Sequence, residues 1–228
     1  KISSAGETLT RTVTVPIVTA GAAAVKSSID FETAMTGVMK TVDETATTSY
    51  ADIAEAIKKM STETASSKTE IAAVAEAAGQ LGVGADDIEK FTKVMIMLGD
   101  TTNVSAQDAA TALAKFVNIT GDSLDDVDRL GSAIVDLGNN FATDEASIIA
   151  MATRLASAGT IAGLSSTDIL ALAASMSSVG IEAEAGGTAM SQTLTNIGNK
   201  VASFKDGTEE ALDDISKVTG MSAQEFAD

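Results

Sequence analysis

Adjacent carboxylates are the residues in this sequence whose types and spacing come closest to a catalytic arrangement. Two carboxylates can divide acid and base roles between them, as in glycoside hydrolysis. Such pairs include Asp86-Asp87, Asp125-Asp126, Glu209-Glu210 and Asp213-Asp214. Most of them fall where a helix is expected to begin, and the positive end of the helix dipole favours acids there. The sequence also lacks histidine and cysteine, the commonest general base and the thiol nucleophile. We therefore predict no catalytic residues and no enzymatic activity.

Signals for a cofactor or a metal ion are equally incomplete. Gly82-Val83-Gly84 supplies two of the three glycines of a dinucleotide-binding loop, and no strand is expected before it. The acidic run Asp122–Asp128 lacks the glycine and the final acid of a calcium-binding loop. Asn139-Asn140 and Gly186-Gly187 are typical of loops or helix ends. We predict no cofactor-binding residues and no metal-binding residues.

Net charge narrows the classes of partner. The 228 residues include 15 basic and 32 acidic side chains, which give a formal charge of −17. Binding to the phosphates of nucleic acid requires clustered lysine and arginine, and the densest basic spot here is Lys58-Lys59. We therefore expect no specific nucleic-acid binding and no attachment to an anionic membrane surface. Because the chain begins with Lys1 rather than Met, we also expect it to be a section of a longer protein.

Helices must position these side chains, because the hydrophobic pattern is helical almost throughout. Apolar residues recur at spacings of three and four, as in Ile88, Phe91, Met95 and Leu98. A hydroxyl followed three residues later by an acid predicts a helix N-cap, and it occurs at Ser49, Ser67, Ser105, Ser165 and Ser222. Glycines are expected to end helices at Gly82, Gly99, Gly121, Gly138, Gly159 and Gly180.

These signals predict an all-α protein: an irregular bundle of short helices and helical hairpins, preceded by one or two longer helices. Residues 1–18 are expected to form a short extended segment, because β-branched residues alternate with polar ones around Pro16. Residues 19–66 are expected to form long helices with thin apolar stripes, and residues 67–206 a compact helical core region. Residues 207–228 are expected to form C-terminal helices, the last of them cut short.

Several short motifs, taken in order, resemble the core region of phage tail tape measure (minor tail) proteins. They are Leu81–Phe91, Val94–Gly99, Thr102–Ala110, Ala133–Asn140, Ala162–Ser165, Val179–Ile181 and Gly187–Met190. Val13–Ile17 and Asp30–Met35 resemble the segment before this core, and Val218–Phe226 resembles its closing motif. No single motif is specific to the family, and the resemblance rests on their order over nearly the whole chain.

The resemblance implies a structural protein of the virion, made in the host cytoplasm and held in the lumen or tip of the tail. Proteins of this family set tail length during assembly and occupy the tail tube or tip before genome ejection. The implied partners are other copies of the chain, tail tube proteins and tail tip or baseplate hub proteins, with DNA passing nearby. Because glycines divide the middle of the chain, we hypothesise that this section is folded and lies at the tip end of the tape.

Two other functions stay open from the sequence. The small residues at Gly21–Val25, within Thr14–Val25, could pair helices in the host membrane after release and assist passage of the genome. Leakage of liposomes caused by a peptide of residues 10–45 would support this function. A bacterial helical scaffold or sensor domain is the third reading, based on the stretch Thr41–Lys68, which is rich in Thr, Ser and Ala.

Overall fold

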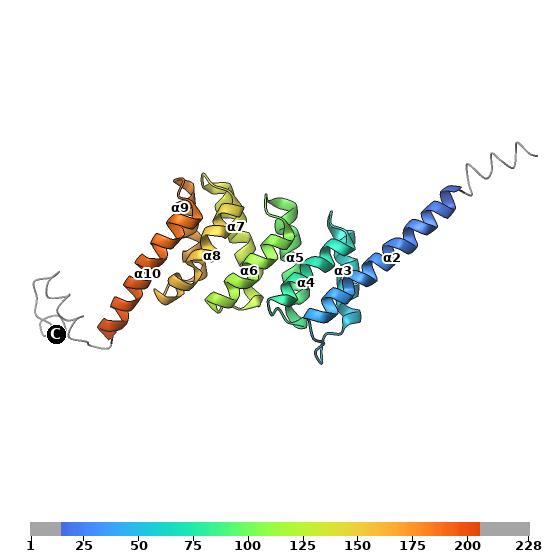
Figure 1. Ribbon diagram of the computed structural model, residues 1–228, viewed down its shortest axis with the longest axis horizontal. Helices are drawn as coiled ribbons and strands as arrows, with labels where there is room; N and C mark the ends of the chain where they lie inside the picture. Colours follow the sequence, from blue (N-terminus) through green and yellow to red (C-terminus); the bar gives the residue numbers. More distant parts are fainter. Residues whose placement is uncertain (1–14, 206–228) are drawn as a thin grey trace, which may run out of the picture. The chain divides into compact units, whose positions relative to one another are not determined.

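The computed structural model describes residues 15–205, and these residues form nine α-helices and one short 3₁₀ helix, with no strand among them (Figure 1). The helices are α2 (Val15–Thr41), α3 (Tyr50–Glu63), α4 (Lys68–Gln80), α5 (Ala85–Thr101), α6 (Ala106–Thr120), the 3₁₀ helix η2 (Leu124–Asp126), α7 (Val127–Asn140), α8 (Glu145–Ile161), α9 (Ser166–Ser178) and α10 (Ala183–Lys205). The predicted all-α fold is confirmed. The helices expected over residues 207–228 lie outside the described residues.

Two compact units divide the chain between Ile96 and Met97, within α5. In the first unit, α4 packs on both α2 and α3. In the second unit, α8 is central: α6, α7, α9 and α10 all pack on it, and α7 also packs on α9. The helix pairs that pack most closely in each unit therefore lie no more than two helices apart along the chain.

The sequence-based boundary at residue 67 separates α4 from α2, whereas the structure packs these two helices closely. A methyl group added at Gly79 of α4 would lie 2.5 Å from the Val42 side chain, and one added at Gly37 of α2 would overlap the Glu76 carboxylate. The two glycines thus allow α2 and α4 to approach each other. The grouping of helices depends on this crossing, which the hydrophobic pattern of either helix alone does not reveal.

The N-terminal end of α2 corrects one expectation. Residues 1–18 were expected to be extended, but α2 already begins at Val15. Pro16 occupies the first turn of this helix, where a backbone N–H has no partner within the helix and the fixed φ of proline already suits helical geometry. The part of that expectation that covers residues 1–14 lies outside the described residues.

Hydroxyl caps begin the helices where the sequence predicted them. The hydroxyl oxygens of Ser49, Ser67, Ser105 and Ser165 accept backbone N–H groups three residues on, at 3.1–3.3 Å. Ser222 lies outside the described residues. The sequence analysis missed the cap of α8, where the Asp144 carboxylate accepts the backbone N–H of Ser147 at 3.0 Å.

Glycines end helices at only some of the predicted places. Gly82, Gly121 and Gly180 have φ of 92°, 75° and 79°, a left-handed conformation that ends a helix easily at glycine. Gly99, Gly138 and Gly159 instead lie inside the last turns of α5, α7 and α8, so the prediction is wrong there. Each of these three faces a residue of the following helix, Ala106, Glu145 and Ile169 respectively. They serve close packing at helical hairpins rather than chain reversal.

Many hydroxyl side chains within the helices bond to the backbone of their own helix. Thr111 donates to the carbonyl oxygen of Gln107 at 2.9 Å, and Thr160 donates to that of Ala156 at 2.8 Å. This arrangement satisfies a hydroxyl without solvent, so threonine can lie beside the apolar faces of these helices.

Thr92 of α5 departs from that arrangement. It is 1% exposed, and its hydroxyl finds no hydrogen-bond partner within the described part of the chain. An unpaired buried hydroxyl costs about 1–3 kcal/mol. We expect Thr92→Val to raise the free energy of unfolding by about 1 kcal/mol, measured by urea denaturation followed by circular dichroism.

Thr153→Val is the matched control for this substitution. The Thr153 hydroxyl donates to the carbonyl oxygen of Ile149 at 2.8 Å, so its removal is expected to bring no such gain. Equal stabilisation by the two variants would show that the added methyl group, and not the unpaired hydroxyl, is responsible.

Candidate functional site

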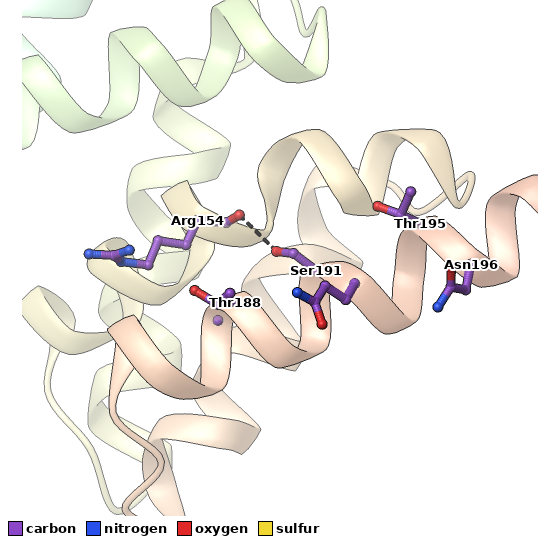
Figure 2. Close-up of a pocket in the computed structure, with 7 residues that line it drawn as sticks. Arg154, Thr188, Ser191, Thr195 and Asn196 are labelled. Atoms are coloured by element: carbon purple, nitrogen blue, oxygen red, sulfur yellow. Dashed lines mark hydrogen bonds between the residues drawn. The ribbon is translucent and has the colours of Figure 1, made fainter.

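A polar groove of about 570 Å³ lies between α8 and α10 (Figure 2). Its lining residues are Arg154, Gly187, Thr188, Ser191, Gln192, Thr195 and Asn196. The five polar residues from α10 recur at spacings of three and four, which places them on one face of the helix. Figure 2 shows four of them following one another along α10, while Arg154 comes from α8.

Close contact with α8 fixes the position of that polar face. The Ser191 hydroxyl donates to the carbonyl oxygen of Arg154 at 3.1 Å, which is the dashed line in Figure 2. Farther along α10, a methyl group added at Gly198 would lie 2.8 Å from the carbonyl oxygen of Ile161. The Arg154 guanidinium donates to the Glu184 carboxylate at 3.2 Å, so its charge is already paired. The groove therefore offers hydroxyl and amide hydrogen bonds, but no activated nucleophile.

Among the carboxylate pairs named above, Asp86 lies within the described residues and has several hydroxyl partners. It lies in the first turn of α5, and its Oδ1 accepts hydroxyls from Thr45, Thr48 and Thr47 at 2.6, 2.7 and 2.8 Å. These hydrogen bonds hold the pKa of Asp86 below its usual range, Thr45 contributing most. The carboxylate ties the loop between α2 and α3 to the start of α5, which is a structural role.

Within residues 15–205, the other carboxylate pair and the loop motifs named above lie in separate places along the fold. Asp126 of the pair in η2 accepts a hydrogen bond from Arg129 at 3.0 Å, and Gly82 and Gly84 lie in the turn between α4 and α5. Asn139-Asn140 ends α7 as predicted, whereas Gly186-Gly187 lies inside α10 rather than in a loop. The reason is packing: a methyl group added at Gly187 would lie 3.2 Å from the Arg154 side chain. Glu209-Glu210 and Asp213-Asp214 lie outside the described residues.

Neither a metal-binding cluster nor a membrane-spanning helix is present in the described part of the chain. Across residues 15–205, no group of three or more His, Cys, Asp or Glu side chains is arranged to hold a metal ion. Among the helices of that same range, none has both the length and the apolar character needed to cross a membrane.

Hydrogen-bonded carboxylates make the fold sensitive to acid. Within residues 15–205, five groups have a pKa below the usual value, and the largest cause in each is a hydrogen bond from one side chain: Asp52 (Ser49), Glu70 (Ser67), Asp86 (Thr45), Asp144 (Asn103) and Asp168 (Ser165). A pKa that is lower in the folded state stabilises the fold above the unfolded value, 3.8 for Asp and 4.5 for Glu. That stabilisation is lost as the pH falls below these values and through the folded-state pKa.

We therefore expect the urea midpoint of unfolding to fall between about pH 5 and pH 2. Asp86→Asn is expected to lower the midpoint at neutral pH and to show a smaller further loss in acid, because its charged acceptor is already gone. Asp87→Asn, at the neighbouring position, is the control and should retain the full loss. The local role of Asp86 is contradicted if the two variants lose stability equally on acidification.

A second groove, of about 780 Å³, lies between α2 and α3 in the first unit. Phe31 and Met35 form its buried floor, and the side chains of Lys58 and Lys68 also line it. Lys58 belongs to the densest group of basic residues in the sequence, but the apolar groove beside it was not predicted. Beyond this groove, α2 runs past α3 and α4 (Figure 1), and its Val25 and Ile29 are 60% and 57% exposed.

Comparison with known proteins decides the family. A family model described as phage-related minor tail protein matches residues 54–228. The chain belongs to this family. A probable tape measure protein of Halomonas phage phiHAP-1 is 29% identical to it over 199 residues, which cover 81% of this chain. These residues are 23% of that relative, so the chain spans about a quarter of its length. No solved structure matches the chain.

Membership in the minor tail family confirms the resemblance seen in the sequence motifs. Proteins of this family are structural components of phage tails, and the chain is accordingly assigned a structural role in the tail of the virion. The polar groove, the groove between α2 and α3, and the exposed end of α2 are thus surfaces available for contacts within a tail.

Proposed function

We propose that the chain is a folded section of a tape measure protein, which sets tail length during assembly and occupies the tail tube or tip before genome ejection. The observation that carries the proposal is the 29% identity, over 81% of the chain, to a probable tape measure protein. The family match runs from within α3 through α10, which favours a shared role for this long section over a shared motif.

The arrangement of helices supports a folded section rather than the measuring rod. The second unit places α6, α7, α9 and α10 on α8, with tight turns between successive helices. A rod that measures length needs a long uninterrupted helix, at 1.5 Å per residue. We therefore place this section at the tip end of the tape, where it contacts tail tip or tube proteins.

An in-frame deletion of residues 15–205 from the phage gene tests the proposal. Assembly of normal tails is expected to fail, as observed by electron microscopy of lysates. Tails that do form should be shortened by much less than the roughly 290 Å that these residues would span as one helix. Normal tails from the deletion phage would contradict the structural role, and shortening by that full length would contradict the folded section.

A gold label attached at this section tests its placement. We expect the label at the tail tip when intact virions are imaged. As a control, the same label on the major tail tube protein should decorate the whole shaft. A label found along the shaft and away from the tip would contradict the placement at the tip end. It would not contradict the proposed tape measure role.

Self-association is the second part of the proposal. Val25 and Ile29 are four residues apart on α2, so they share one face of a helix end that the neighbouring helices leave uncovered. Ile197 and Val201 of α10 have the same spacing and are 49% and 45% exposed. Exposed apolar stripes of this kind gain stability when copies of the helix pair. Light scattering of the purified chain is expected to give a mass of two or more copies.

A further inference from the structure

We propose that the groove between α2 and α3 holds residues 209–218 of a second copy of the chain. This inference rests on the self-association proposed above, and it names the surfaces that meet. The groove belongs to the first unit, whereas residues 209–218 follow the last described helix in sequence.

The groove has an apolar floor that is long enough for a helix face. Phe31 and Met35 of α2 are 7% and 5% exposed and lie at its base. Met39 continues the same side of the groove, while Tyr50 and Ala54 of α3 form the opposite side. The lining positions on α2 span residues 27–39, which corresponds to about 18 Å along the helix. A face of two to three helical turns matches this length.

Positive charge lines this apolar floor. The Lys58 ammonium lies 5.5 Å from the centroid of the Phe31 ring, and Lys68 lines the groove from the first turn of α4. Within residues 15–205 neither lysine forms an ion pair with an acid. One acid, Glu32 of α2, also lines the groove. In a chain with twice as many acids as bases, an apolar groove with two available lysines favours an acidic amphipathic occupant.

Residues 209–218 have that chemistry in their sequence. Residues 206–228 contain seven acids and one lysine. At about 100° per residue, a helix over residues 209–218 would place its apolar residues within an arc of about 120°: Ala211, Leu212, Ile215 and Val218. In such a helix, Glu209 and Asp214 would flank this arc on either side. The apolar arc fits the Phe31 and Met35 floor, and the edge carboxylates fit Lys58 and Lys68.

The absence of cysteine from the chain makes the contact directly measurable. Ala54→Cys in the groove and Ile215→Cys in the acidic segment are prepared as separate full-length chains, mixed and oxidised. We expect a mixed disulfide dimer on a non-reducing gel, separated from either homodimer by a size tag on one partner. Lys58→Glu with Lys68→Glu should lower its yield about fivefold or more. Adding Glu209→Lys and Asp214→Lys to the partner chain should restore the yield.

Lys93→Glu with Lys115→Glu is the matched control, since it reverses two lysines outside the groove. The inference is overturned if this control lowers the yield as much as the groove variant does. A chain that carries both Ala54→Cys and Ile215→Cys is oxidised in parallel. The inference is also overturned if this chain forms only an intramolecular disulfide while the mixture of single variants gives no disulfide-linked dimer. Light scattering distinguishes this inference from the proposed self-association. If the chain forms oligomers but gives no mixed disulfide, the groove contact is contradicted and self-association still holds. If the chain is a monomer at every concentration, both proposals are contradicted.

Discussion

Replacing Phe116 by alanine is expected to lower the free energy of unfolding by about 3–5 kcal/mol. Phe116 lies on α6, is 1% exposed, and belongs to the helix that packs on the central α8. Large side chains are scarce here, because aromatic residues make up only 3% of the chain. Loss of this side chain therefore removes apolar area that smaller neighbours do not replace, and it leaves a cavity in the core of the second unit. Urea denaturation followed by circular dichroism measures the loss.

Ile119→Ala is the control on the same helix. Ile119 is 43% exposed, so its truncation is expected to cost less than about 1 kcal/mol. If the two substitutions cost the same, burial of the side chain is not what makes Phe116 important to stability. A smaller loss at Phe116 than at Ile119 would contradict the packing of α6 described above.

Gly99→Ala is expected to destabilise the chain by about 1–3 kcal/mol, although alanine favours a helix interior by about 1 kcal/mol over glycine. Gly99 lies in the last turn of α5. A methyl group there would lie 2.8 Å from the backbone nitrogen of Ala106 and 2.9 Å from its Cβ. The obstacle is backbone rather than a flexible side chain, so α5 and α6 must move apart. Thermal and urea unfolding of the variant measure the effect.

Gly84→Ala separates this steric effect from the substitution itself. A methyl group added at Gly84 meets no atom within 4 Å, and the residue precedes the first turn of α5. Its replacement is expected to change stability by less than about 1 kcal/mol. An increase in stability for Gly99→Ala, as helix propensity alone predicts, would show that α5 and α6 are not closely packed at this point.

Helices were predictable from the sequence because their signals are local. A cap such as Ser165 with Asp168 lies within four residues, and the hydrophobic spacing from Ile88 to Leu98 lies within one helix. Both are visible without knowing which helices meet. The start of α2 was mispredicted for two reasons. Alternation of β-branched and polar residues also occurs in helices, and proline, here Pro16, is tolerated in a first turn.

Features that depend on two helices were not predictable. Gly99 and Gly121 are both glycines near helix ends, yet one packs against Ala106 and the other takes φ of 75°. Only the position of the following helix distinguishes them. The two grooves depend in the same way on pairs of helices, α8 with α10 and α2 with α3. Lys58 could be noted as basic, but its place over the Phe31 ring follows from how α2 and α3 pack.

The order of packing along the chain has a mechanical consequence. Because the closest helix pairs within each unit lie within two positions in sequence, no long-range crossing among the described helices has to be undone before one of them is released. Under tension, these helices are expected to separate from their units one after another. Local contacts also favour rapid re-formation once the tension is removed. Repeated stretching and relaxation should therefore return each unit to its folded state.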